Sequence, residues 1–186
     1  MKVALLVIVC IQLLLMNYIV LCDSCQKGQE SKDAFPVTAV TGGQYLAKCV
    51  GPVFVPNEEL SISRFGITGL VVNGGDTSAN CTINNMDSKQ VVAKYSVTDI
   101  QSLPKDSYFF YYDMPSPVTL DIGTRYLTCC YLDSMIGNAV FDTTIPSQLA
   151  NYSGEMFHSS SGYQFPEFSL SGGVGFAYYN MLPILG

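Results

Sequence analysis

The chain has 186 residues, 48% of them hydrophobic and only 13% charged, and its formal net charge is −6. An acidic surface repels phosphate backbones, so this composition argues against nucleic acid as a partner. The acidic residues are scattered along the chain, and Glu58-Glu59 is the only adjacent pair. The sequence therefore lacks the acidic runs with which proteins bind mineral or many divalent ions at once.

Residues 1–22 form an apolar leader in which Lys2 is the only charge and only Gln12 and Asn17 interrupt the apolar run. This pattern predicts a secretory signal peptide that is removed before Asp23. An uncleaved membrane anchor is the alternative, because the segment is close to spanning length, although it has no strong basic flank.

Cleavage at that point would leave 164 residues (186 minus 22), with 8 Lys and Arg against 15 Asp and Glu and a net charge of −7. A chain of this length can build one domain with its own core. We therefore predict a single domain over residues 23–186, in which residues 23–36 form a loosely held N-terminal arm.

The rest of the sequence has the pattern of β-structure. Helical periodicity is absent, and Gly and Pro recur at short intervals between runs of β-branched and aromatic residues. Many short strands separated by turns predict an all-β fold, an antiparallel β-sandwich or barrel. The expected strands lie within residues 44–55, 60–72, 80–97 (a hairpin), 107–113, 117–133, 138–141, 154–158 and 174–179.

Two stretches carry a family resemblance, "PVTLDIGTRYLTCCY" (117–131) and "YQFPEFSLSGGVGFAYY" (163–179). With them, residues 40–180 resemble secreted jelly-roll domains of unknown function, which are similar to galactose-binding-like sandwiches. The resemblance implies a jelly-roll-like β-sandwich with an extracellular, non-enzymatic role. This chain departs from the pattern by carrying cysteines within the sandwich and by lacking Trp.

The adjacent Cys129 and Cys130 fall within the expected strand "TRYLTCCYL". Successive side chains of a strand point to opposite faces, so the two cysteines should serve different neighbours and not be bridged to each other. One face carries Tyr126, Thr128, Cys130 and Leu132, and the other carries Arg125, Leu127, Cys129 and Tyr131. Disulfides are the default state of such cysteines in a secreted chain.

Five cysteines remain after cleavage of the leader, so at most two bridges can form within the chain: Cys25, Cys49, Cys81, Cys129 and Cys130. The jelly-roll resemblance implies that Cys81 lies near the paired cysteines, which favours a bridge from Cys81 to Cys129 or Cys130. Cys25 is expected to form a disulfide with Cys49 and so attach the arm to the domain. The remaining vicinal cysteine is then a buried thiol or, alternatively, an intermolecular link.

Two triplets match the N-glycosylation acceptor pattern, Asn80-Cys81-Thr82 and Asn151-Tyr152-Ser153. We expect Asn80 and Asn151 to lie in loops or at strand edges, and at least one of them to carry an oligosaccharide.

Catalytic and metal-binding patterns are weak. His158 is the only histidine, and its context contains no nucleophile motif, so it is interpreted as a strand-end residue and no enzyme is predicted. Asp113, Asp121 and Asp133 surround the aromatic hairpin, and Asp121 is interpreted as a turn residue before Gly123. A calcium site at Asp76 in "NGGD" is an alternative interpretation, but neither a metal site nor a cofactor is predicted.

Aromatic residues are the remaining signal, with 12 Tyr and 10 Phe. In the run 107–113, Tyr108, Phe110 and Tyr112 alternate with Phe109 and Tyr111, so one set should face outward if the other is core. Outward Tyr side chains would suit a sugar or protein surface, whereas crowded aromatics in a sandwich are more often packing.

These features predict a secreted, non-enzymatic structural or adhesive protein, a component of an extracellular or mineral-associated organic matrix. The alternative is a soluble carbohydrate-binding, lectin-like module. The expected partners are extracellular matrix proteins or glycans, with no membrane span in the mature chain.

Overall fold

The computed structural model describes ten segments of the chain: residues 39–41, 49–68, 78–106, 108–132, 138–142, 148–159, 165–166, 168–171, 176–179 and 181–186. The predicted leader, the predicted arm with Cys25, and Asp76 and Asp133 lie outside these segments. Within the segments, no helix is long and apolar enough to cross a membrane.

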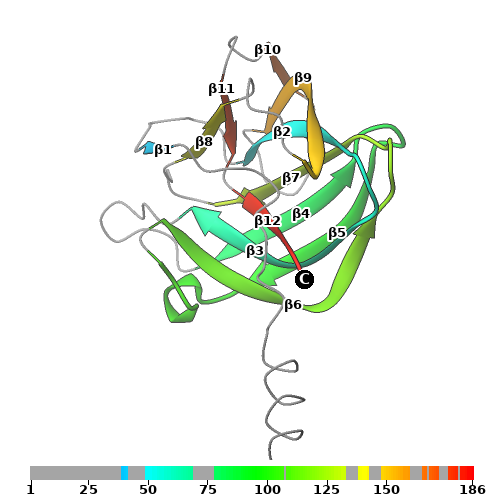
Figure 1. The fold of residues 1–186 in the computed structure, drawn as a ribbon. Helices are drawn as coiled ribbons and strands as arrows, with labels where there is room; N and C mark the ends of the chain where they lie inside the picture. Colours follow the sequence, from blue (N-terminus) through cyan, green and yellow to red (C-terminus); the bar gives the residue numbers. More distant parts are fainter. Residues whose placement is uncertain are drawn as a thin grey trace, which may run out of the picture. The chain divides into compact units, whose positions relative to one another are not determined.

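The described chain consists almost entirely of β-strands (Figure 1). They are β1 (Ala39–Thr41), β2 (Cys49–Pro56), β3 (Leu60–Thr68), β4 (Ala79–Asn85), β5 (Gln90–Val97), β6 (Phe109–Leu120), β7 (Tyr126–Tyr131), β8 (Asn138–Asp142), β9 (Ala150–Ser159), β10 (Phe168–Ser171), β11 (Phe176–Tyr179) and β12 (Met181–Leu185), with one 3-10 turn at Ile100–Ser102. All the strand pairs are antiparallel, and the predicted all-β sandwich is confirmed.

Two sheets form the sandwich. One has six strands in the order β10-β9-β2-β7-β4-β5, and the other has three in the order β12-β3-β6. The chain crosses between them repeatedly, because β2, β4, β5 and β7 belong to the first sheet and β3 and β6 to the second. A small third sheet, β1-β8-β11, approaches the first through β11 and β2.

The main core lies between the two large sheets. β3 shows how the sequence builds it: Leu60 and Ile62 are buried, a register shift follows between Ile62 and Arg64, and Phe65 and Ile67 are then buried in turn. Burying each such side chain stabilises the fold by about 1.5–3 kcal/mol. Across the core, the Thr128 hydroxyl on β7 donates a hydrogen bond of 3.3 Å to the backbone carbonyl of Met181 on β12.

Strand β7 is buried on both faces, and this confirms the alternation predicted for "TRYLTCCYL". Tyr126, Cys130 and Leu132 belong to the main core. On the opposite face, Leu127, Cys129 and Tyr131 form a second cluster with Cys49, Val53 and Met86. All six residues of β7 are therefore buried, and the two cysteines lie near the middle of the strand.

Some strand boundaries differ from the prediction. β6 extends to Leu120, so it joins most of the predicted strand 107–113 to residues 114–116 and to residues 117–120, which the sequence predicts as part of a separate strand. β12 was missed because Pro183 interrupts its sequence pattern. A proline is tolerated there because β12 is the end strand of its sheet, so that one side of the strand needs no ladder hydrogen bond.

Candidate functional site

Two disulfides hold the centre of the six-stranded sheet. Cys81 is bonded to Cys130, one of the two partners expected, and the two residues lie directly opposite each other on β4 and β7. Cys49 on β2 is bonded to Cys129. No bridge joins the two vicinal cysteines.

The expected bridge from Cys25 to Cys49 is therefore wrong, because the sulfur of Cys49 is already bonded to Cys129. The expectation that one vicinal cysteine remains a thiol or an intermolecular link fails for the same reason. The reason is the strand order, in which β7 lies between β2 and β4. The cysteine on one face of β7 therefore bonds to β2, and the cysteine on its other face bonds to β4. Strand order between distant segments is not visible in the local sequence pattern.

Polar side chains lie beside the Cys49–Cys129 bridge. The Thr82 hydroxyl is 3.8 Å from Sγ of Cys129, and Nδ2 of Asn84 donates to Oγ1 of Thr82 at 2.9 Å and to the Leu127 carbonyl at 3.3 Å. Both Thr82 and Asn84 are buried. Within the described segments, Oδ1 of Asn84 accepts no hydrogen bond, so the second cluster is not purely apolar.

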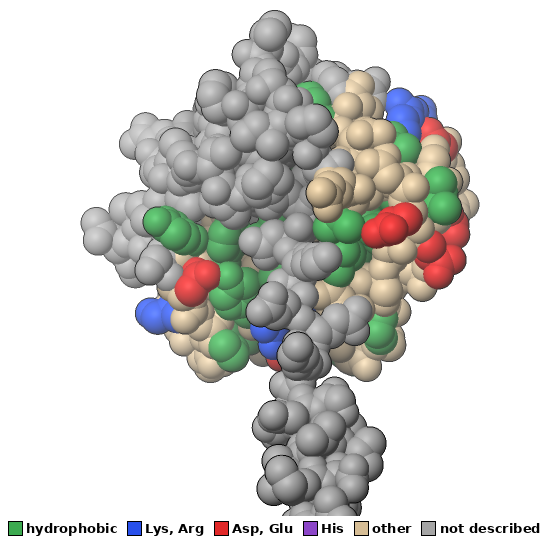
Figure 2. Space-filling model, viewed as in Figure 1, with side chains coloured by type: hydrophobic (Ala, Val, Ile, Leu, Met, Phe, Trp, Pro, Cys, Tyr) green, Lys and Arg blue, Asp and Glu red, His purple; other side chains and the backbone are tan. Residues whose placement is uncertain are grey.

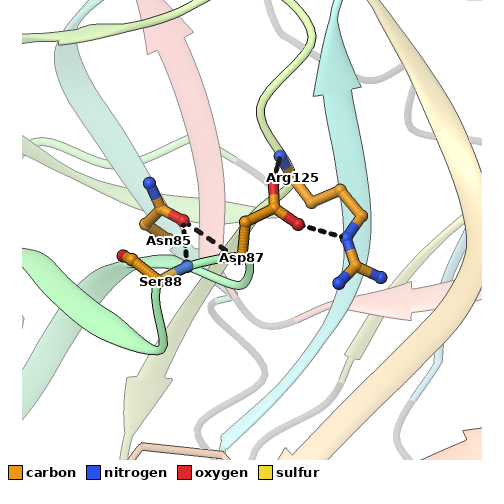
Figure 3. A network of polar contacts seen from close by, with 4 residues as sticks. All are labelled: Asn85, Asp87, Ser88 and Arg125. Carbon is orange, nitrogen blue, oxygen red and sulfur yellow. Dashed lines mark hydrogen bonds and ion pairs between the residues drawn. The ribbon is translucent and has the colours of Figure 1, made fainter.

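A network of polar contacts fixes the β4–β5 hairpin to the turn before β7 (Figure 3). Oδ1 of Asn85 accepts hydrogen bonds of 3.0 Å from the backbone amides of Asp87 and Ser88. The Asp87 carboxylate accepts 2.9 Å and 2.7 Å bonds from the backbone N–H and Nε–H of Arg125. The hydrogen bond from the Arg125 backbone, followed by that from its side chain, lowers the pKa of Asp87.

Backbone hydrogen bonds tie further loops into the same end of the sheets. The Met86 amide donates to the Arg125 carbonyl at 2.8 Å, and the Gly123 amide donates to the Pro56 carbonyl at 3.2 Å. Gly123 has a φ of 74°, a left-handed conformation that favours glycine. We call the loop residues 56–59, 85–89 and 121–125 the loop end.

The loop end exposes acidic and apolar groups on a fixed backbone. Glu58, Glu59 and Asp121 are exposed there, and Ile122 has 64% of its surface exposed. Figure 2 shows acidic side chains gathered along the right flank of the described surface. A backbone held by so many hydrogen bonds loses little conformational entropy on contact with a partner.

A second polar surface surrounds Tyr111 on β6. The Asp106 carboxylate accepts bonds from the backbone amides of Tyr108 (2.6 Å) and Phe109 (2.7 Å) and from the Tyr111 hydroxyl (2.5 Å). Partial burial alone would raise the pKa of Asp106, but the Tyr111 and backbone hydrogen bonds outweigh it and lower this pKa. The carboxylate is thus held ionised at the start of the strand.

Arg64 completes this surface. Its Nε donates to Oδ1 of Asp113 at 2.5 Å, and its guanidinium carbon lies 5.9 Å from the centre of the Tyr111 ring. The hydrogen bond to Asp113 is the main reason that the pKa of Arg64 is raised. We call Arg64, Asp106, Tyr108, Tyr111 and Asp113 the Tyr111 surface.

Most of the aromatic run packs on the core, the alternative that the sequence favoured, and a strict division into a core set and an outward set is wrong. Phe109 and Phe110 are 3% and 4% exposed although they are neighbours in a strand, and only Tyr108 is largely exposed, at 53%. Gly66 on β3 helps to explain this, since a Cβ there would stand 3.1 Å from the Phe109 ring. A glycine in the paired strand leaves room for an aromatic ring on the second face.

The remaining predicted residues are dispersed. His158 is the penultimate residue of β9, near a strand end as expected, and lies opposite Val50 and Phe168. Asp121 lies in a turn as expected, with its carbonyl 3.4 Å from the Thr124 amide. Within the described segments, no three His, Cys, Asp or Glu side chains are placed to hold a metal ion together.

The two acceptor asparagines occupy different environments. Asn80 lies in β4, an inner strand between β7 and β5, so its expected position in a loop or at an edge is wrong. Asn151 is exposed near the start of β9.

In comparison with known proteins, no family model and no curated protein matches this chain.

Proposed function

We propose that this chain is a secreted, non-enzymatic structural or adhesive protein of an extracellular or mineral-associated matrix. The observation that supports it best is the pair of disulfides on the two faces of β7. All four cysteines are 0% exposed, and the bridges join β2, β7 and β4 into one covalent unit. Disulfides persist in oxidising compartments, which include the extracellular space.

The bridges suit a protein that must endure outside the cell. They span sequence separations of 80 and 49 residues. In the chain-entropy model, closing either loop alone stabilises the fold by about 4 kcal/mol, and the two values do not add fully because the loops overlap. Either contribution is large beside a net domain stability of about 5–15 kcal/mol.

The loop end supports the adhesive part of the proposal. Its backbone is fixed by cross-loop hydrogen bonds, and its exposed groups combine carboxylates with the apolar Ile122. Such a surface can contact matrix proteins at a low ordering cost.

Fractionation of the source tissue tests this function. A matrix component stays in the insoluble fraction after salt and decalcifying washes, and it leaves that fraction under denaturing conditions. Recovery of the protein entirely in the first salt wash would contradict the structural role.

Carbohydrate binding is the second candidate, and the Tyr111 surface favours it. Tyr108 is exposed, and its backbone amide donates to the Asp106 carboxylate, which also accepts a bond from the Tyr111 hydroxyl. The Arg64 guanidinium lies over the Tyr111 ring, so this surface offers aromatic faces and polar groups to a sugar. A glycan array probed with the wild-type protein and Tyr108→Ala tests it. Retention on a glycan that is lost in Tyr108→Ala, but kept in the remote exposed control Val92→Ala, would favour this function over the structural one.

A further inference from the structure

We propose that Asn151 is the glycosylation site of the folded protein and that Asn80 stays unmodified, so that the two acceptor triplets differ in occupancy. This inference rests on the proposed secretion. The first reason is exposure of the triplets. Asn151 and Ser153 are exposed and Tyr152 is half-buried, whereas Cys81 and Thr82 are 0% and 2% exposed.

The backbone around each asparagine gives the second reason. Asn80 has strand partners on both sides, Tyr131 on β7 and Ser96 on β5. Asn151 is paired with Val55 of β2 on one side, and on the other side β10 reaches only residues 155–158 of β9. Among the described residues, β10 therefore does not extend to the Asn151 triplet, whereas Asn80 is enclosed by two strands.

The side-chain contacts give the third reason. Nδ2 of Asn151 donates a 2.6 Å bond to Oδ1 of Asn57, and both residues are exposed, so water can replace this bond. Oδ1 of Asn80 accepts a 2.8 Å bond from the exposed Ser96, which water can also replace, so the two triplets differ at their third residue. The hydroxyl of Thr82, which completes the Asn80 triplet, accepts a hydrogen bond from buried Asn84.

The transfer reaction needs the asparagine and the hydroxyl two residues later at the same time. The donor is an oligosaccharide linked to a lipid diphosphate. Nδ2 of the asparagine forms a bond to the anomeric carbon, the bond from that carbon to the phosphate oxygen breaks, the lipid diphosphate leaves, and one amide proton passes to a base. At Asn80, the bridge from Cys81 to Cys130 fixes the middle residue of the triplet in the core. The triplet therefore cannot present its asparagine and its hydroxyl to the enzyme together.

Secretion of the full chain from a eukaryotic host, followed by peptide mapping after treatment with an amide-cleaving glycosidase, tests the inference. We expect conversion of Asn151 to Asp, with Asn80 recovered unchanged. Asn151→Gln and Ser153→Ala should remove the glycan, and the matched control Asn80→Gln should keep it. Opening the bridge with Cys81→Ser and Cys130→Ser should increase the occupancy of Asn80, because the triplet then remains Asn-Ser-Thr and is no longer held by a disulfide.

The outcomes separate the inference from the proposed function. A secreted protein with both sites occupied, with Asn80 alone occupied, or with no glycan would overturn the inference and leave secretion intact. Failure of the natural leader to deliver the chain to the medium would count against the proposed secretion. In that case the same chain behind a heterologous signal peptide still tests the choice between Asn151 and Asn80.

Discussion

The carboxylate of Asp87 joins two loops, since it accepts hydrogen bonds from both the backbone and the side chain of Arg125. The two side chains are 46% and 41% exposed, so solvent weakens their ion pair. We expect Asp87→Asn to lower the free energy of unfolding by about 0.5–1 kcal/mol at pH 7. Urea unfolding of the two proteins measures this difference.

The same residue predicts a pH dependence. The pKa of Asp87 is lowered from 3.8 in the fold, so its contribution is fully present above that pH and is lost as the pH falls through the lower folded-state value. The stability difference between wild type and Asp87→Asn should therefore be constant near neutrality and shrink below pH 3.8. Asp99→Asn is the matched control, since it also removes an exposed carboxylate, and within the described segments no hydrogen bond to that carboxylate is found. A difference that grows on acidification would contradict this account.

At the scale of elements, β2 and β7 approach each other closely at Gly51. A Cβ on Gly51 would stand 2.4 Å from the Thr128 carbonyl oxygen, a backbone atom that cannot move aside without shifting β7. We expect Gly51→Ala to destabilise the fold by about 1–3 kcal/mol. Gly123→Ala is a useful comparison, because a Cβ there meets no atom within 4 Å and only the left-handed φ of 74° opposes it.

Thermal unfolding of both variants measures the effect. The Gly123 variant should lose about 1–2 kcal/mol through backbone strain alone. If Gly51→Ala were as stable as the wild type, β2 and β7 could not be packed as described.

The sequence predicted those elements whose signals are local. The hairpin of β4 and β5 follows from two β-rich runs around "NNMDS", and the two buried faces of β7 follow from simple alternation. The partner of Cys49 could not be predicted, because it depends on β2 lying next to β7, a contact between residues 80 positions apart. The Tyr111 surface was found only in part, since neither the pairing of Arg64 with Asp113 nor the burial of Phe109 beside Gly66 has a local signal.

At the scale of the whole molecule, the two bridges make β7 the covalent centre of the six-stranded sheet. Removing the Cys49–Cys129 bridge with alanine at both positions should lower the free energy of unfolding by about 2–5 kcal/mol. The bridge between Cys81 and Cys130 provides the matched pair, since it ties the same strand from its other face. The two double variants need not lose the same free energy of unfolding, because the two bridges close loops of different length. Unchanged stability in both double variants would mean that the bridges do not hold the sheet.

Burial of the bridges predicts how the intact protein responds to reductants. All four cysteines are 0% exposed, one pair in the main core and the other in the second cluster. A thiolate must reach a sulfur atom before exchange can begin, so each bridge should react only after the sheets separate. We expect both disulfides to be reduced together, at a rate that equals the rate of global unfolding and rises with added urea. Alkylation of quenched samples followed by mass spectrometry measures this, with the denatured protein as the control for fast reduction. Rapid loss of one bridge from the native protein, with the other intact, would show that one face of β7 opens without the rest of the sandwich.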